Sequence, residues 1–173
     1  SQYSMLIARR IRELNTYCEI LPPDTPPERL EGIDLRGVVL SGGPSSVYDE
    51  GAPLAPDWVF ERGVPVLGIC YGMQLLAQQL GGHVGPGVER EFGPATIVQA
   101  RETALLAGLA SELDVWMSHG DRIEELPPGF EAAATSPNSP VAVMADTTLP
   151  ARMMPVLRGT SSLSMASPTR SAI

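Results

Sequence analysis

A cysteine at position 70 stands between two glycines in the segment Gly68–Gly72. The apolar run at 64–67 precedes this segment and a helix-like run at 73–80 follows it, so the pattern predicts a strand, a tight turn and a helix. The glycines permit a crowded turn that holds the side chain at the C-terminal end of the strand. This is a nucleophile elbow with cysteine in place of serine. The alternative is a buried core cysteine at a strand-to-helix turn.

The helix predicted after Cys70 begins beside its sulfur. The positive end of a helix favours a thiolate over a thiol, and the thiolate is the nucleophilic form of cysteine. We therefore expect the helix to favour the thiolate at Cys70.

The elements that must position this cysteine alternate between strand and helix. The sequence predicts a helix over 4–14, a short strand at 17–21, a helical turn at 28–31, a buried strand at 37–40, a helix around 56–62, a strand at 64–69, and an elbow helix that Gly81 and Gly82 end. This order indicates an α/β fold with a doubly wound, mostly parallel sheet and flanking helices. The later part is richer in strands, predicted at 96–99, 115–117, 130–134 and 141–145, with turns at 127–129 and 137–140.

Composition excludes several classes of function. The 173 residues carry a net charge of −8, which argues against nucleic acid or an anionic membrane as a partner. The sequence has no apolar stretch of the roughly 20 residues that cross a bilayer. Cys18 and Cys70 are too few for a disulfide framework, which indicates the cytoplasm, and they argue against a four-ligand zinc site. There is no lysine, so a lysine nucleophile and a P-loop are excluded.

Both ends of the sequence depart from a complete α/β domain. The chain opens on a helix, so we expect a first strand to be missing. The final 23 residues hold three arginines, five serines and no acidic residue. We predict an amidotransferase-sized domain over 1–150, truncated at both ends, and a disordered or frameshifted tail over 151–173.

Six segments in order resemble the class I (triad) glutamine amidotransferases and, within them, the glutaminase domain of GMP synthase. The segments are 1–10, Leu40–Pro44, Gly68–Gln74, Leu80–Val84, Glu89–Gly93 and Ser118–Asp121. Glu89–Gly93 and Trp116–Asp121 favour GMP synthase over the glutaminases of anthranilate, carbamoyl phosphate or CTP synthesis.

The resemblance implies that Cys70 attacks the side-chain amide of glutamine, releases ammonia and forms a thioester that water hydrolyses. It also implies roles for other residues of the matching motifs. The backbone N–H groups of Gly43 and Tyr71 would form the oxyanion hole, and Gln74, Ser118 and His119 would bind the substrate. No cofactor and no metal are expected in this domain.

The general base is the main departure from the family. The family places it in a His-Pro-Glu segment after a final strand, and this sequence contains no His-Pro-Glu. His83 and His119 are the only histidines; we expect a structural role for His83 and a substrate-pocket role for His119, not the base. A frameshift near Leu149 explains the absence, because codons for 156–163 read one base later permit Phe-Ser-Glu-Val-Arg-His-His.

Three functions stay open on the sequence. The first is the glutaminase domain of GMP synthase, supplying ammonia for the amination of XMP to GMP by an ATP-pyrophosphatase (synthetase) domain or subunit that binds ATP and Mg²⁺. The second is a catalytically dead, truncated fragment that at most binds glutamine or a synthetase subunit. The third is another cysteine hydrolase on the same scaffold, against which Ser41–Pro44 and Gln74 count.

Overall fold

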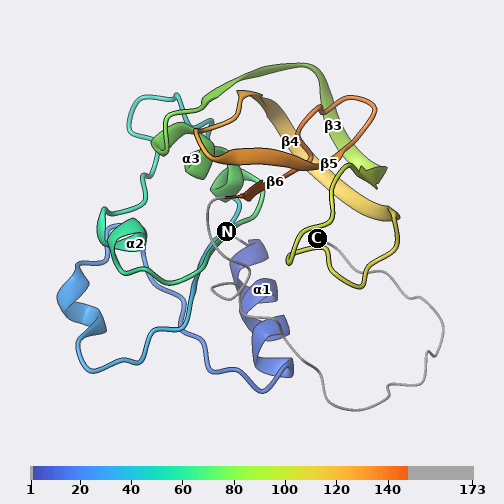
Figure 1. Ribbon diagram of the computed structural model, residues 1–173. Coiled ribbons are helices and arrows are strands. Elements are labelled where there is room, and N and C mark those ends of the chain that lie inside the picture. The colour runs from blue at the N-terminus through green and yellow to red at the C-terminus, as the bar shows by residue number, and fades with distance from the viewer. Residues whose placement is uncertain (1, 148–173) are drawn as a thin grey trace. The chain divides into compact units, whose positions relative to one another are not determined.

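The computed structural model describes residues 2–147, apart from the side chains of Gln2, residues 88–91 and His119. The predicted tail at 151–173 lies outside the described residues. In chain order the elements are α1 (Gln2–Glu13), the 3₁₀ turn η1 (Pro27–Leu30), β1 (Val38–Leu40), α2 (Trp58–Glu61), β2 (Val66–Gly68), α3 (Tyr71–Gln79), β3 (His83–Gln99), β4 (Glu112–Glu125), β5 (Phe130–Thr135) and β6 (Val143–Asp146) (Figure 1).

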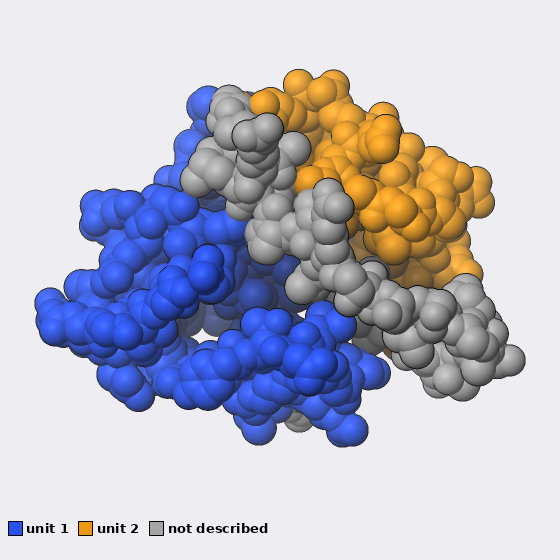
Figure 2. Space-filling model, turned by 60° about the horizontal axis from the view of Figure 1, so that its bottom comes forward, with its two compact units in different colours: residues 1–88, 121–128 blue, residues 89–120, 129–173 orange. Residues whose placement is uncertain are grey.

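The chain divides into two compact units (Figure 2). The first comprises residues 1–88 and 121–128, and the second begins at 89–120 and continues from 129. The strands β3 and β4 therefore each contribute residues to both units. The single domain expected over 1–150 stays a prediction.

The first unit carries the α/β pattern that the sequence predicts. β1 and β2 pair in parallel, with Val38 opposite Val66 and Leu40 opposite Gly68. A parallel pair needs a crossover connection, and α2 lies in the connecting segment. The predicted helices match α1, α2 and α3, and the helical turn matches η1. The α/β class is confirmed.

The second sheet has the strand order β4-β3-β5-β6. β3 pairs antiparallel with β5, and β5 pairs antiparallel with β6, which lies beside it at the orange end of the colour scale (Figure 1). Among the described strands, parallel pairing is restricted to β1 and β2, so the sheet is less parallel than the sequence suggests. The strands after the elbow are joined by short connections without helices, which favour antiparallel neighbours. Their core consists of Ile97, Leu106, Val115, Ala133, Ala134 and Ala145.

Several local predictions need correction. No strand forms at 17–21, because no described strand pairs with this segment; Tyr17 and Ile20 are 79% and 44% exposed. β1 is not fully buried, since Val39 on β1 and its neighbour Leu67 on β2 are 36% and 38% exposed. The strands predicted at 96–99 and 115–117 are parts of the much longer β3 and β4.

Candidate active site

Cys70 occupies the sharp turn between β2 and α3. Its backbone has φ +52° and ψ −115°, a left-handed conformation that a residue with a side chain rarely adopts. Such strain costs about 1–3 kcal/mol and persists only where the surrounding structure holds it. Here the N–H of Ile69 donates to the carbonyl of Leu40 at 2.9 Å, which fixes the end of β2 against β1. The structure confirms the strand, turn and helix predicted for the elbow.

Close backbone contacts explain the two flanking glycines. A Cβ built on Gly68 would lie 2.6 Å from the carbonyl group of Gly72, and one built on Gly72 would lie 2.0 Å from the oxygen of Leu40. No side chain fits at either separation. The turn is therefore possible because the first turn of α3 packs directly on the end of β1.

The loop after β1 packs against the elbow. A Cβ on Gly42 would lie 3.6 Å from the Cβ of Cys70, and one on Gly43 would lie 3.4 Å from the Cγ of Tyr71. Within the described residues, the backbone N–H groups of Gly43 and Tyr71 donate to no acceptor. Two backbone donors thus belong to segments that meet beside Cys70, although their role as an oxyanion hole stays a prediction.

Gln74 lies one helical turn after Cys70 and is only 6% exposed. Its backbone N–H donates to the carbonyl of Cys70 at 3.1 Å. Its side-chain Nε2 donates to the carbonyl of Asp121 at 3.0 Å, and Asp121 Oδ1 accepts a hydrogen bond of 2.7 Å from the hydroxyl of Tyr48. Asp121 ends one of the matching sequence motifs, whereas Tyr48 carries no local signal that it reaches this site, so the sequence gives it no role.

Burial raises the pKa of the Cys70 thiol. The expectation that α3 favours the thiolate is therefore wrong, because the loss of hydration penalises the thiolate more than the helix end stabilises it. Within the described part of the chain, no side chain forms a hydrogen bond with Cys70 Sγ. A base or a cation from elsewhere must activate this thiol.

The hydroxyl of Tyr48 is held in its protonated form. The side-chain hydrogen bond with Ser46 lowers the pKa of Tyr48, but the hydrogen bond with Asp121 and the nearby carboxylate charges outweigh it and raise the pKa overall. The hydroxyl consequently remains a donor to Asp121 throughout the neutral range.

The remaining predicted residues lie farther along the chain. His83 begins β3; its side chain is 57% exposed and its Nε2 lies 3.6 Å from Glu124 Oε2. Ser118 is an exposed residue of β4 in the second unit, and the side chain of His119 lies outside the described residues. The substrate-binding roles of Ser118 and His119 stay predictions.

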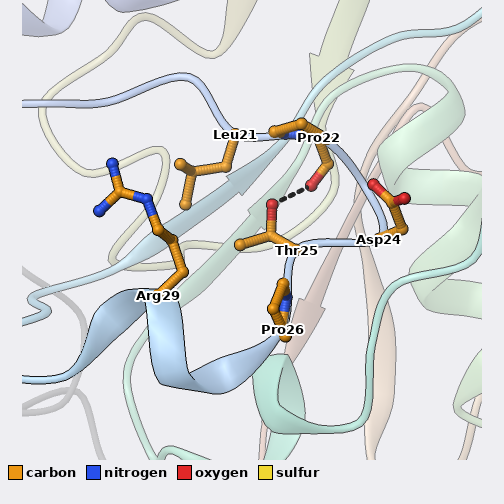
Figure 3. Close-up of a pocket in the computed structure, with 6 residues that line it drawn as sticks. All are labelled: Leu21, Pro22, Asp24, Thr25, Pro26 and Arg29. Carbon is orange, nitrogen blue, oxygen red and sulfur yellow. Dashed lines mark hydrogen bonds between the residues drawn. The ribbon is translucent and has the colours of Figure 1, made fainter.

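A pocket of about 330 Å³ lies in the loop before η1 (Figure 3). Thr25 is buried there, and its hydroxyl donates to the carbonyl of Pro22 at 2.7 Å, the dashed line in Figure 3. Arg29 lines the pocket and pairs with Glu19 at 3.4 Å. None of the lining residues belongs to the elbow, so this pocket adds nothing to the chemistry at Cys70.

Two other kinds of site are absent from residues 2–147. No group of three or more acidic, histidine or cysteine side chains there could hold a metal ion. Within the same residues, each helix is too short or too polar to traverse a lipid bilayer.

Similarity to known proteins agrees with the elbow geometry. The family model "Glutamine amidotransferase class-I" matches residues 1–152. The chain is 56% identical over 145 residues to the glutamine-hydrolysing GMP synthase of Thermomicrobium roseum, covering 84% of this chain and 28% of that protein. It is 51% identical over 146 residues to the enzyme of the same name from Aquifex aeolicus, covering 84% of this chain and 29% of that protein. The chain thus spans less than a third of the length of these curated relatives.

Solved structures agree. A GMP synthase subunit from Thermoplasma acidophilum superposes with a TM-score of 0.78 at 33% identity, covering 86% of this chain and 74% of that one. A glutamine amidotransferase from Thermotoga maritima superposes with a TM-score of 0.63 at 25% identity, covering 77% and 61% of the two chains.

Proposed function

The chain belongs to the class I glutamine amidotransferases, and from this premise we propose that it is the glutaminase part of a GMP synthase. The observation that carries the proposal is the backbone of Cys70, a side-chain-bearing residue held at φ +52° between a strand and a helix. That conformation exposes a nucleophile beside the N–H groups of the following turn.

The proposed reaction uses the geometry of the elbow in two steps. Cys70 Sγ attacks the side-chain amide carbon of glutamine, and the carbonyl oxygen becomes an oxyanion. Backbone N–H groups of Tyr71 and Gly43 stabilise it; one such donor contributes about 10²–10³ in rate in other enzymes. Collapse of this intermediate breaks the C–N bond and releases ammonia after the nitrogen gains a proton. Water then attacks the thioester and releases glutamate.

The partner follows from the names of the relatives. Because the curated relatives are more than three times longer than the region they share with this chain, we propose that the ammonia passes to a synthetase domain or subunit. That part would bind ATP and Mg²⁺ and aminate XMP to GMP. The glutaminase part would need no cofactor of its own, and Ser118 and His119 would contact the glutamine.

A second candidate function is glutamine binding without turnover. The raised pKa of Cys70 and the absence of a described hydrogen-bond partner for its sulfur favour it. General base catalysis contributes roughly 10²–10⁴ in rate, so a thiol without a base would bind glutamine and turn it over very slowly.

Covalent labelling separates these possibilities. The 173-residue chain is treated with a diazo-ketone analogue of glutamine, with Cys70→Ala as the control, and the modified residue is identified by mass spectrometry. Labelling of Cys70 alone, together with release of ammonia from glutamine, supports the glutaminase. Labelling without ammonia release supports glutamine binding alone. A folded chain that the analogue does not label contradicts both.

A further inference from the structure

Asp121 joins two segments of the first unit that are far apart in the sequence. The hydroxyl of Tyr48 donates to its Oδ1 at 2.7 Å, across 73 positions of the chain. Gln74 Nε2 donates to its backbone carbonyl at 3.0 Å, across 47 positions. These hydrogen bonds connect the loop that follows Gly43 with the helix that begins beside Cys70.

A tight turn fixes the position of Tyr48. The N–H of Ser46 donates to Asp49 Oδ2 at 2.7 Å, and the N–H of Asp49 donates back to the carbonyl of Ser46 at 3.0 Å. Val47 is 7% exposed and anchors the same turn. The side chain of Tyr48 itself is 50% exposed, so its position does not come from burial in a core. What the turn determines is where the hydroxyl of Tyr48 lies.

The contact with Asp121 determines how the carboxamide of Gln74 is oriented. A backbone carbonyl only accepts hydrogen bonds, so the NH₂ group of Gln74 must face Asp121 and the opposite atom is Oε1. Within the described residues Oε1 has no hydrogen-bond partner, although Gln74 is 6% exposed. A buried acceptor without a partner is unfavourable, and a bound ligand with an N–H group relieves that cost.

We propose that Tyr48 is a positioning residue for the substrate: through Asp121 it holds Gln74 so that Oε1 accepts a hydrogen bond from an N–H group of bound glutamine. This inference rests on the proposed function. It adds that the site selects, at Oε1, a donor such as an ammonium or a carboxamide, because a carboxylate there would place two acceptors against each other.

The test compares two reagents on the full 173-residue chain. The glutamine diazo-ketone must bind before it reacts with Cys70, whereas iodoacetamide reports only the reactivity and accessibility of the thiol. In Tyr48→Phe we expect the diazo-ketone concentration for half-maximal labelling to rise about three- to tenfold. The rate with iodoacetamide should change by less than about twofold. Tyr17→Phe is the matched control, because Tyr17 also donates to a carboxylate at 2.7 Å, that of Glu19.

Substitution of Asp121 provides a second comparison that does not depend on the folding of Tyr48→Phe. Asp121→Asn keeps an oxygen that accepts from Tyr48 and should label like the wild type. Asp121→Ala removes that oxygen and should label like Tyr48→Phe. Combining Asp121→Ala with Tyr48→Phe should add nothing, because both changes break the same hydrogen bond.

The outcomes separate this inference from the proposed function. Equal labelling of wild type and Tyr48→Phe by the diazo-ketone overturns the positioning role alone. So does an equal loss with both reagents, which indicates a change at the thiol or in the fold. A wild-type chain that reacts with iodoacetamide but not with the diazo-ketone overturns the proposed function and, with it, the positioning role.

Discussion

The Cα of Gly72 lies so close to Leu40 that a Cβ built on it would come within 2.0 Å of the Leu40 carbonyl oxygen. This contact joins the first turn of α3 to the last residue of β1. It also lies two residues from Cys70, so the position of the nucleophile depends on it.

Gly72→Ala should therefore destabilise the fold, because the added methyl group meets backbone that cannot move independently. We expect a loss of about 1–3 kcal/mol or more in the free energy of unfolding. Urea denaturation measures it. Gly42→Ala is the control: its Cβ would make an ordinary 3.6 Å contact with the Cβ of Cys70, and its cost should stay below that of Gly72→Ala. Equal costs would contradict the contact.

Alkylation of Cys70 should depend on pH in the way that a buried thiol does. Since burial raises its pKa, the rate with iodoacetamide should still be rising above about pH 9, where an ordinary thiol is mostly ionised. Because the folded pKa is the higher one, the contribution to stability is present below the unfolded pKa and is lost as the pH rises through the folded pKa. Mass spectrometry of the Cys70 peptide follows the rate, and Cys70→Ala gives the background from Cys18. A midpoint at or below about 8.5 would show a thiolate stabilised by α3.

Two leucines should respond very differently to truncation. Leu75 on α3 is 4% exposed, whereas Leu67 on β2 is 38% exposed. We expect Leu75→Ala to lower the free energy of unfolding by about 2–5 kcal/mol, since it leaves a cavity. Leu67→Ala should cost less than about 1 kcal/mol, because it loses contacts on one side only. If both leucines cost the same in chemical denaturation, then a surface covers Leu67 in solution.

Gln79 should be sensitive to loss of its amide. Its Oε1 accepts from the N–H of Ala55 at 2.9 Å and its Nε2 donates to the carbonyl of Ala55 at 3.0 Å. Ala55 is 5% exposed, so water does not easily replace these partners. Gln79→Glu keeps the acceptor but places a carboxylate against a carbonyl, and we expect a loss of about 1–3 kcal/mol. Thermal unfolding of Gln79→Glu beside Gln99→Glu, where Gln99 also bonds backbone carbonyls but at an exposed position, measures the difference.

The sequence predicts the elbow well because its determinants are local. Gly68 and Gly72 are required by contacts within the turn and with β1, and the spacing of two glycines around a cysteine records that requirement. The helix ends were also predictable, since Gly81 adopts φ +94° after α3.

Contacts between distant segments were not predictable in the same way. Nothing near Tyr48 in the sequence indicates that its hydroxyl reaches Asp121, 73 positions away. The segment at 17–21 has the composition of a strand, but a strand also needs a partner, and none of the described strands pairs with it. Gly93 and Pro94 suggest a break, yet β3 continues through them, because pairing with a neighbouring strand outweighs local preference.

The contacts of Gly68 and Gly72 bear on how this cysteine could be transplanted. A protein engineer who copied only the thiol and its amide donors onto another scaffold would reproduce the reactive groups and lose the backbone angle that presents them. The portable unit is larger and chemically plain: two residues without a Cβ and the carbonyl of Leu40 that occupies the vacated space. Substitution tolerance at this site should therefore be lowest at positions that carry no functional group.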